Sequence, residues 1–458
     1  MSRCLRGLWP SWRRNGGGGG LARGPLVAAL DVGTSKVLAV VAVPEEAGLR
    51  VVATAGVTSA GVRRGAVVDM PAAAAAMGAA MQRVRRLCAQ PLVSVLLGSA
   101  AGQILCFNGY AETAMAMPGS EITAQDVVGV LDQVRRMELP PGYHLAHAIP
   151  QGFVVDGYEG CRDPVGMAGQ HLAVRAHLVA CQGAVLQNLL KAAADAAIDV
   201  EDFAVAGLAA AESVLTPEER REGVLLIDLG AGATQVVAVL GGEPVLTATV
   251  PLGGEHVTAD IAAGLRLTRG QAEALKWRHA SADLQSVPAG RVVDLDGLPP
   301  KELPGTVVHR AAESADSAGP AAAGNAGAGA SASPPAQVDE RDLAEITAAR
   351  VEEIMQQVAD MLGQGGKRLH LAAGAVLTGG GSRLRGIQAV GWRGLGMPVR
   401  CGGAIGATEA LGAPECAAAV GLLQMQAQRL TGHGGRLLTT EVSARRLWPP
   451  WRLLSARG

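Results

Sequence analysis

The stretch LVAALDVGTSKVLAVVAV, residues 26–43, decides the fold. It contains two apolar runs rich in β-branched residues, joined by a Gly-Thr-Ser turn at residues 33–35. This pattern predicts a β-hairpin. A second stretch, GVLLIDLGAGATQVVAVLGGEPV at residues 223–245, repeats the order of strand, Asp-x-Gly turn and strand. The internal repeat predicts an α/β protein made of two related lobes, each of which opens with a hairpin.

An aspartate heads each of the two turns. Backbone N–H groups of such a turn point toward a polyphosphate, and glycine lets the backbone approach it closely. Each aspartate, at the end of its strand, can hold a Mg²⁺-bound water that bridges phosphate oxygens. Either hairpin alone is more simply an ordinary turn, but the matched pair predicts a nucleotide site. The residues expected to bind phosphate or Mg²⁺ are Asp31, Gly33, Thr34, Ser35, Lys36, Asp228, Gly230, Gly232 and Thr234.

Three further features extend this predicted site. Gly254 stands just before a predicted helix and is a candidate lip over the nucleotide. Glu273 and Lys276 lie three residues apart on a helix, share one face and could grip the ribose or the base edge. Most such pairs are only solvated ion pairs. The triple glycine Gly379, Gly380 and Gly381 lies between a strand and a helix, where the backbone can approach a base or an anion.

Composition and charge exclude several classes of function. Half of the chain is apolar and only 3% is aromatic, which favours tightly packed α/β layers. Nine arginines and no acidic residue lie in segments 1–24 and 445–458, so residues 25–444 hold 31 basic and 41 acidic residues. An acidic body argues against nucleic-acid binding. The seven cysteines are never spaced as C-x-x-C, and we expect reduced thiols in a cytosolic protein.

The chain also divides into segments of different character. We expect a disordered N-terminal extension at 1–25 and a first lobe in two parts, 26–90 and 172–222, interrupted by an inserted subdomain at 91–171. A second lobe follows at 223–425, and within it the low-complexity Ala/Gly/Ser/Pro segment 311–336 is read as a disordered loop. A linker at 426–444 precedes a terminal tip at 445–458. Helices are expected at 72–90, 183–197 and 341–362.

The terminal tip combines tryptophan, leucine and arginine. Trp rings prefer the lipid headgroup layer, and arginines there meet anionic lipids. The side chains expected at the membrane are Leu447, Trp448, Trp451, Arg452, Leu453 and Leu454. Two prolines at 449–450 make one continuous helix improbable. A near copy, LWPSWR at 8–13, is either a second interfacial foot on a Gly linker or a disordered extension.

Taken in order, these elements resemble the actin-like ATPase superfamily and, within it, the FtsA family of cell-division proteins. The local motifs that carry the resemblance are LDVGTSKV, GVRRGAVVDM (61–70), HAIPQGFVVDGYEGCRDPVGMAG (147–169), VRAHLVAC, DFAVAGLAAAESVLT (202–216), VPLGGEHVTADIA, QAEALKWRHA (271–280), AGAVLTGGGSRLRGI and AAVGLL (418–423). They cover about residues 26–425. The resemblance implies an actin-like (ribonuclease H-like, duplicated) two-lobe fold with an inserted α+β subdomain.

The same resemblance implies a function. FtsA proteins bind ATP and Mg²⁺, form filaments at the cytoplasmic face of the inner membrane, tether the C-terminal tail of FtsZ, and recruit later division proteins. The helix at 341–362 is the candidate FtsZ surface, with Arg341, Glu345 and Arg350 expected to be exposed. The alternatives are a small-molecule kinase and a pilus-assembly adaptor of the same superfamily. A heat-shock chaperone is disfavoured because no β-rich domain follows the second lobe.

Some positions depart from the family pattern. Ala231 and Ala233 stand where the family usually has Gly and Thr, and we expect Thr234 to replace the missing hydroxyl in part. Ala206 stands where relatives that hydrolyse ATP well carry an acidic residue or Gln, and the nearest carboxylate is Glu212. We therefore expect firm ATP binding and slow hydrolysis, with a mainly structural role for the nucleotide.

Overall fold

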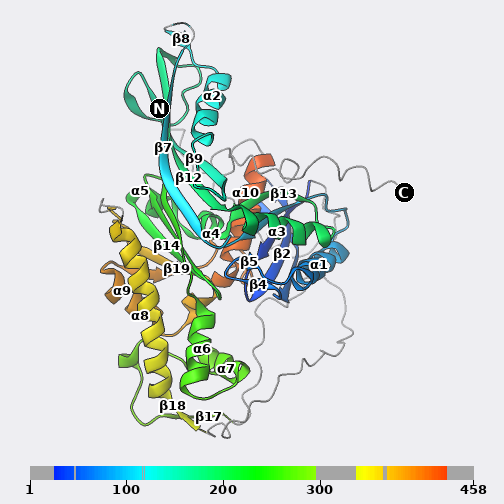
Figure 1. Cartoon of the computed structure of the whole chain (residues 1–458), viewed down its shortest axis with the longest axis vertical. Coiled ribbons are helices and arrows are strands. Elements are labelled where there is room, and N and C mark those ends of the chain that lie inside the picture. The colour runs from blue at the N-terminus through cyan, green and yellow to red at the C-terminus, as the bar shows by residue number, and fades with distance from the viewer. Residues whose placement is uncertain are drawn as a thin grey trace.

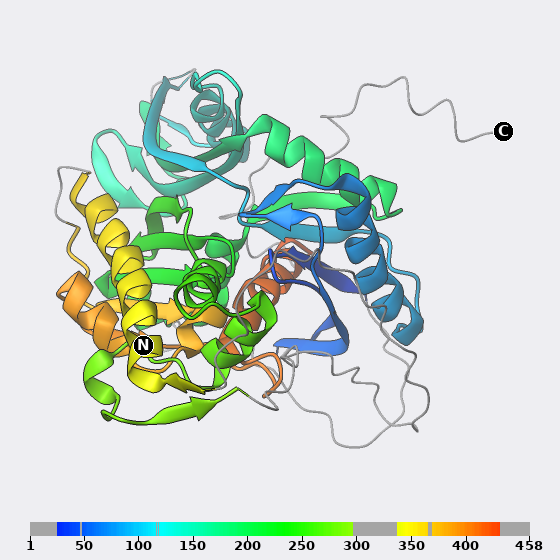
Figure 2. The ribbon, with the colours of Figure 1, turned by 60° about the horizontal axis from the view of Figure 1, so that its bottom comes forward.

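A computed structural model describes residues 25–45, 48–115, 117, 119–295, 337–364 and 369–430. Two α/β lobes lie side by side, and a third, elongated subdomain extends from them (Figures 1 and 2). The predicted 311–336 loop, the N-terminal extension and the membrane tip lie outside the described residues. Among those that are described, no helix is both long and apolar enough to cross a bilayer.

The first lobe is built on a five-stranded sheet. Its order is β13-β6-β1-β2-β3, with β1 antiparallel to β2 and parallel to β6. The strands are β1 (Val27–Val32), β2 (Lys36–Glu45), β3 (Gly48–Thr58), β6 (Val95–Ser99) and β13 (Val200–Val205). Alternate side chains of each strand face opposite sides. Leu30 packs toward α1 (Met70–Leu87) and α3 (Gly183–Asp195), whereas Ala29 packs toward α10 (Ala417–Leu430).

The second lobe repeats this plan. Its sheet has the order β16-β15-β14-β19-β20, and β14 is antiparallel to β15 and parallel to β19. The strands are β14 (Val224–Leu229), β15 (Thr234–Leu240), β16 (Glu243–Val250), β19 (Ala375–Thr378) and β20 (Val399–Cys401). Strand by strand, the two sheets match in order and direction. The two-lobe duplication predicted from the paired hairpins is therefore confirmed.

Helices cover the second sheet and extend it into a smaller subdomain (Figure 1). The helices are α6 (Gly254–Gly264), α7 (Arg269–Arg278), α8 (Glu340–Gln364) and α9 (Ile387–Leu395). Short strands β17 (Val292–Asp294) and β18 (Gln337–Asp339) pair ahead of α8. The helices predicted at 72–90, 183–197 and 341–362 correspond to α1, α3 and α8. Helix α1 starts where the Asp69 carboxylate accepts the backbone N–H of Ala72 at 3.1 Å, as an N-cap does.

The inserted subdomain is a four-stranded antiparallel sheet with one helix. Its order is β10-β9-β12-β7, and α2 packs on one face through Val130 and Val134. The elements are β7 (Ile104–Ala114), β8 (Ser120–Glu121), α2 (Ala124–Arg135), β9 (Tyr143–Val155), β10 (Tyr158–Cys161), β11 (Ala168–Gly169) and β12 (His171–Gln182). In Figure 1 it rises above the lobes.

Strand pairing corrects three boundaries drawn from the sequence. Strand β6 pairs with β1 and β13, so it belongs to the first lobe rather than to an insertion that starts at 91. Strand β12 pairs with β7 and β9, so the insertion runs past 171 to Gln182. Helix α10, assigned to a second lobe ending at 425, packs on the first-lobe sheet through Val420 and Leu422. The chain thus returns to its first lobe.

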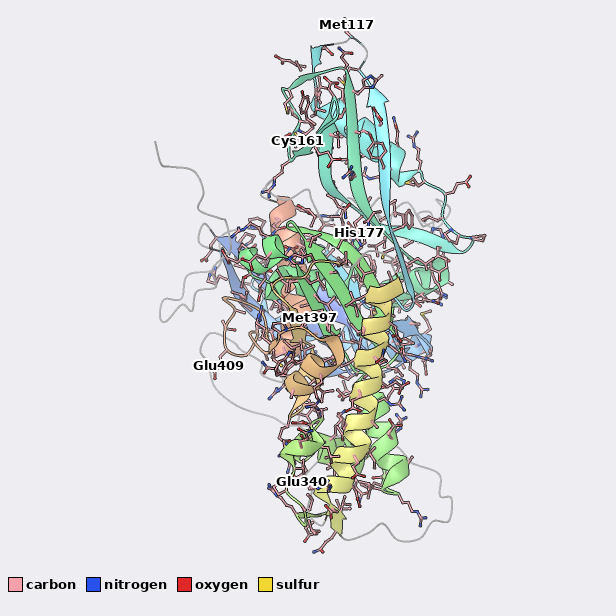
Figure 3. All side chains as sticks on the ribbon, turned by 90° about the vertical axis from the view of Figure 1, so that its left-hand side faces the viewer. Met117, Cys161, His177, Glu340, Met397 and Glu409 are labelled. Atoms are coloured by element: carbon pink, nitrogen blue, oxygen red, sulfur yellow. The ribbon has the colours of Figure 1, made fainter. Side chains whose placement is uncertain are left out.

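A polar cluster around the buried His177 and Thr247 joins the insertion to the second lobe, and we call this cluster, which also includes Asn108 and Gln151, the latch. The His177 ring lies between Asn108 Oδ1 and Thr247 Oγ1, each 2.9 Å from a ring nitrogen. Gln151 Nε2 donates to the Pro244 carbonyl at 2.9 Å. Burial, with a smaller contribution from His147, lowers the pKa of His177 to about 3, so the ring is neutral at physiological pH. Figure 3 places His177 at the base of the insertion.

Candidate functional site: a cavity between the lobes

A cavity of about 540 Å³ lies between the two lobes. It collects residues from both hairpin turns, from α6 and α7, and from the loop after β19. Of the residues that the sequence nominated for binding, all but Thr234 line it. They are Asp31, Gly33, Thr34, Ser35, Lys36, Asp228, Gly230, Gly232, Gly254, Glu273, Lys276, Gly379, Gly380 and Gly381. Residues far apart in the chain therefore share one site.

The two turns are closed by equivalent backbone hydrogen bonds. Gly33 N donates to the Lys36 carbonyl at 3.0 Å, and Gly230 N donates to the Ala233 carbonyl at 3.1 Å. They also meet across the cavity. A Cβ atom on Gly232 would lie 2.5 Å from Thr34 Oγ1 and 2.9 Å from the backbone N of Arg64. Only glycine fits at that contact, because real Cβ atoms do not approach other heavy atoms so closely.

The acidic pair at the floor of the cavity is electrostatically frustrated. Burial raises the pKa of Asp31 to about 6, against the opposing effect of the Lys36 charge. Burial and then the charge of Asp31 raise the pKa of Asp228 to about 7, again opposed by Lys36. Two half-buried carboxyls with one lysine leave a deficit of positive charge. A divalent cation placed here would relieve that deficit.

The donor set fits a cation that keeps most of its water. In the described part of the chain, no three His, Cys, Asp or Glu side chains gather to hold a metal ion. A cation beside Asp31 and Asp228 would therefore have at most these two side-chain ligands among the described residues. Mg²⁺ commonly binds in this way, through one or two carboxylates, several waters and substrate phosphates. Asp31 and Asp228 are the residues that would hold it.

The loop after β19 presses against the acidic pair. Gly379 has φ +78°, and a Cβ atom there would lie 2.2 Å from Asp228 Oδ1. Any other residue would be strained in its backbone and would collide with the carboxylate. The triple glycine opens the 3₁₀ turn η2 (Gly380–Arg383), and helix α9 starts only at Ile387. The triple glycine thus lies between a strand and a helix, as predicted, but a tight turn rather than the N-terminus of an α-helix follows it directly.

Helices α6 and α7 form a third wall held by one hydrogen-bond network. Lys276 Nζ donates to Glu273 Oε2 at 2.6 Å, to Thr258 Oγ1 at 2.8 Å and to the Gly254 carbonyl at 3.0 Å. The Glu273 and Lys276 side chains are 24% and 14% exposed. Glu273 and Lys276 are therefore not the solvated surface pair that their spacing alone would suggest. Their hydrogen bonds fix α7 to the start of α6.

Sequence comparison assigns the chain to a known family. The model for "Cell division protein FtsA" matches residues 225–421, and that for "SHS2 domain inserted in FTSA" matches residues 102–180. The chain is 30% identical over 410 residues to the cell division protein FtsA of Escherichia coli K12, covering 87% of this chain and 89% of that protein. It belongs to the FtsA family.

Two further likenesses agree with this assignment. FtsA of Pseudomonas aeruginosa PAO1 is 29% identical over 410 residues, with 89% of this chain and 90% of that protein covered. Among solved structures, a PilM-PilN type IV pilus biogenesis complex aligns with a TM-score of 0.55 at 16% identity, covering 88% of this chain and 98% of the other. That likeness shows the fold. The expected actin-like two-lobe fold with an inserted subdomain is confirmed, and the insertion is the SHS2 domain of the FtsA family.

The geometry corrects one expectation about this FtsA-family site. Thr234 is fully buried, and its hydroxyl donates to the Leu252 carbonyl at 2.8 Å. It therefore faces away from the cavity and does not replace the hydroxyl missing at Ala233. Ala206 does line the cavity, as expected, whereas Glu212 pairs with Arg220 at 2.9 Å and is not a lining residue.

Sequence reasoning missed several polar or aromatic residues of the cavity, including Gln235, Trp277, Arg383 and Glu415. Gln235 could have been found, because it is a polar residue that follows Thr234 at the start of a strand whose other residues are apolar. Its side chain spans the lobes, accepting from Gly207 N at 2.5 Å and donating to the Ala100 carbonyl at 3.2 Å. The other three come together only through the fold.

The three residues nominated as an FtsZ surface on α8 differ in exposure. Arg341 and Glu345 are exposed and lie 3.8 Å apart. Arg350 is only 23% exposed, and it pairs with Asp260 of α6 at 2.6 Å and also with Glu353. The expectation that Arg350 is free on the surface is therefore wrong. It ties α8 to α6.

Proposed function

We propose that this FtsA-family chain binds ATP with Mg²⁺ in the cavity between its lobes and uses the nucleotide to control its own polymerisation. The observation that carries the proposal is the pair of aspartate-headed turns facing each other across one cavity. Lys36, Thr34 and Ser35 supply a charge and hydroxyls for the phosphates. When bound, Mg²⁺ would neutralise phosphate charge beside Asp31 and Asp228.

Hydrolysis is proposed to be slow. A general base for water must lie within hydrogen-bond reach and be free to accept a proton. Ala206 offers no such group, and the amide of Gln235 is bonded on both sides to backbone atoms. The chain thus holds the phosphates better than it activates water.

Calorimetric titration of the full chain with ATP, with and without Mg²⁺, tests the nucleotide site. We expect Mg²⁺-dependent binding that Asp31→Asn and Asp228→Asn each abolish. Asp195→Asn, on the exposed face of α3, is the matched control and should bind as the wild type does. Equal binding by all four proteins would refute the site.

We further propose that the chain fastens FtsZ filaments to the cytoplasmic face of the inner membrane and recruits later division proteins. The terminal Trp/Arg tips supply the membrane contact, and α8 with Arg341 and Glu345 supplies the surface for the FtsZ tail. Membership of the FtsA family supports this role over the kinase and pilus-adaptor alternatives.

Two experiments separate these contacts. Deleting residues 445–458 should abolish sedimentation with anionic liposomes, while deleting 1–24 should weaken it if the N-terminal copy is a second foot. Arg341→Glu should weaken binding of an FtsZ tail peptide, whereas Arg429→Lys on α10 should not. A tail peptide that binds Arg341→Glu normally would remove α8 from the proposed interface.

A further inference from the structure

Three side chains from three separate elements meet on one wall of the cavity. Trp277 comes from α7, Arg383 from η2, and Glu415 from the 3₁₀ turn η3 (Pro414–Cys416). The guanidinium carbon of Arg383 lies 5.2 Å from the centroid of the Trp277 ring. Arg383 Nη1 donates to Glu415 Oε1 at 2.7 Å. All three residues line the cavity, so this group faces whatever the cavity holds.

The group is held in place from behind. Trp277 Nε1 donates to Glu273 Oε1 at 3.0 Å, and this bond fixes the plane of the indole ring. The other oxygen of Glu273 is bonded to Lys276 at 2.6 Å. On the opposite side, the Glu415 carboxylate fixes the guanidinium plane. Two flat π-systems are therefore pre-oriented in the cavity lining.

Glu415 carries an unused acceptor. Its side chain is only 7% exposed, and Oε2 is buried with no hydrogen-bond partner among the described residues. Leaving a buried charged oxygen unpaired is costly, so such an atom calls for a donor. A phosphate would be repelled by this carboxylate. The amine of a base and the hydroxyls of a ribose are suitable donors.

Apolar residues complete the surroundings. Val351 and Ile354 of α8 line the same cavity, and both side chains belong to the buried core of the second lobe. The acidic pair and Lys36 line the same cavity and are the groups proposed to bind Mg²⁺ and the phosphates. Aromatic rings and guanidinium planes are the groups on which nucleic-acid bases stack, because every base presents a π-face.

We propose that Trp277 and Arg383 clamp the base of the bound nucleotide, and that Glu415 Oε2 accepts a hydrogen bond from its nucleoside. This inference rests on the proposed nucleotide site and assigns its base-binding and selectivity-determining residues. The Arg383–Trp277 contact is the closed form of the clamp. A base that enters the cavity separates the Trp277 ring from the Arg383 guanidinium. The base then stacks between these two planes or against the guanidinium.

The test compares a ligand with a base and one without. The full chain is titrated in Mg²⁺ buffer with ATP and with inorganic tripolyphosphate. Trp277→Ala and Arg383→Ala should each weaken ATP binding by roughly 10- to 100-fold, the range expected for a lost base stack. Tripolyphosphate affinity should not change, and Trp277→Phe should bind ATP nearly as the wild type does.

Helix α9 offers matched controls outside the cavity. Trp392 is 63% exposed, and Arg393 pairs with Asp283 at 3.0 Å. Trp392→Ala and Arg393→Ala therefore remove the same side-chain types without touching the site, and both should keep wild-type affinity for ATP. A loss in these controls equal to the loss in the clamp variants would overturn the clamp.

The acceptor is tested by selectivity. Purine riboside triphosphate lacks the base amine, and dideoxy-ATP lacks the ribose hydroxyls. The wild type should prefer ATP over at least one of them by roughly tenfold. In Glu415→Gln the amide oxygen stays with Arg383 and turns its N–H₂ donor toward the nucleoside, so that preference should vanish. An unchanged preference would overturn the acceptor role.

These outcomes separate the two proposals. If neither ATP nor tripolyphosphate binds, the nucleotide site itself is refuted, and the clamp with it. If both bind with equal affinity, or if the alanine variants bind ATP as the wild type does, the clamp alone is refuted.

Discussion

Removing the charge of Asp228 should make the ligand-free chain more stable at neutral and alkaline pH. The pKa of this carboxyl is about 7 in the fold, against an ordinary value of 3.8. The folded state therefore binds the proton more tightly than the unfolded state. Each pKa unit corresponds to about 1.4 kcal/mol, so the difference is worth on the order of 4 kcal/mol.

The sign follows from the two pKa values. Below about pH 4 both states carry the proton, and its stabilising effect is fully present. Between about pH 4 and pH 7 only the folded state keeps the proton, and the free energy of unfolding falls as the pH rises. Above about pH 7 the effect is lost. Asparagine imitates the neutral carboxyl at every pH, so Asp228→Asn should avoid this decline.

Urea unfolding of the ligand-free proteins at a series of pH values measures the difference. Asp228→Asn and the wild type should have similar stability near pH 4 and should diverge to about 4 kcal/mol near pH 8. Asp195→Asn should follow the wild type throughout. Adding Mg·ATP should stabilise the wild type and leave Asp228→Asn unchanged. Parallel curves for Asp228→Asn and the wild type would refute the frustrated acidic pair.

Other perturbations address single contacts. Gly379→Ala should fold with a displaced cavity wall and bind ATP at least roughly tenfold more weakly, because the new Cβ would meet Asp228 Oδ1; calorimetry measures this. His177→Ala should leave the buried Thr247 hydroxyl without its ring partner and cost about 1–3 kcal/mol, while Asn108 Oδ1 still accepts from Gln151. The free energy of unfolding measures the loss, and faster amide exchange confined to β7, β9 and β16 would place it at the latch. Arg350→Ala should loosen α8 from α6 and lower the free energy of unfolding by about 1 kcal/mol. Binding of the FtsZ tail peptide should stay intact. Thermal unfolding measures the first effect, and peptide titration measures the second.

Local signals made the hairpins and most of the cavity predictable. Each aspartate, its turn glycines and the flanking strands lie within a few residues of one another, so the motif carries its own geometry. The two copies then imply a shared cavity, because duplicated lobes bring equivalent turns face to face. Gly33 and Gly230 form the same turn hydrogen bond in both copies.

Long-range contacts were beyond the reach of the sequence. Strand β6 is a short apolar run and β12 is a longer strand with interspersed polar residues, and only pairing with distant strands decides to which sheet each belongs. The Thr234 hydroxyl turned from the cavity because its acceptor, Leu252, lies on another segment. Nothing in the sequence distinguishes Trp277, Arg383 and Glu415 from solvent-exposed residues. No periodicity or spacing links the three positions.

The SHS2 domain is attached to both lobes: covalently to the first lobe and through the latch to the second. Its chain enters from and returns to the first lobe, yet His177 bonds to the Thr247 hydroxyl and Asn108 donates to the Val245 carbonyl, both in the second lobe. Past this point, β7 and β12 continue for six more residues, from Asn108 to Ala114 and from His177 to His171, which is roughly 20 Å. Swinging one lobe against the other by about 10° would therefore displace the far end by roughly 3.5 Å. The SHS2 domain would thus act as a lever that converts a small rotation of the lobes into a larger displacement at its far end. A protein bound at that end would be displaced according to the degree of lobe closure.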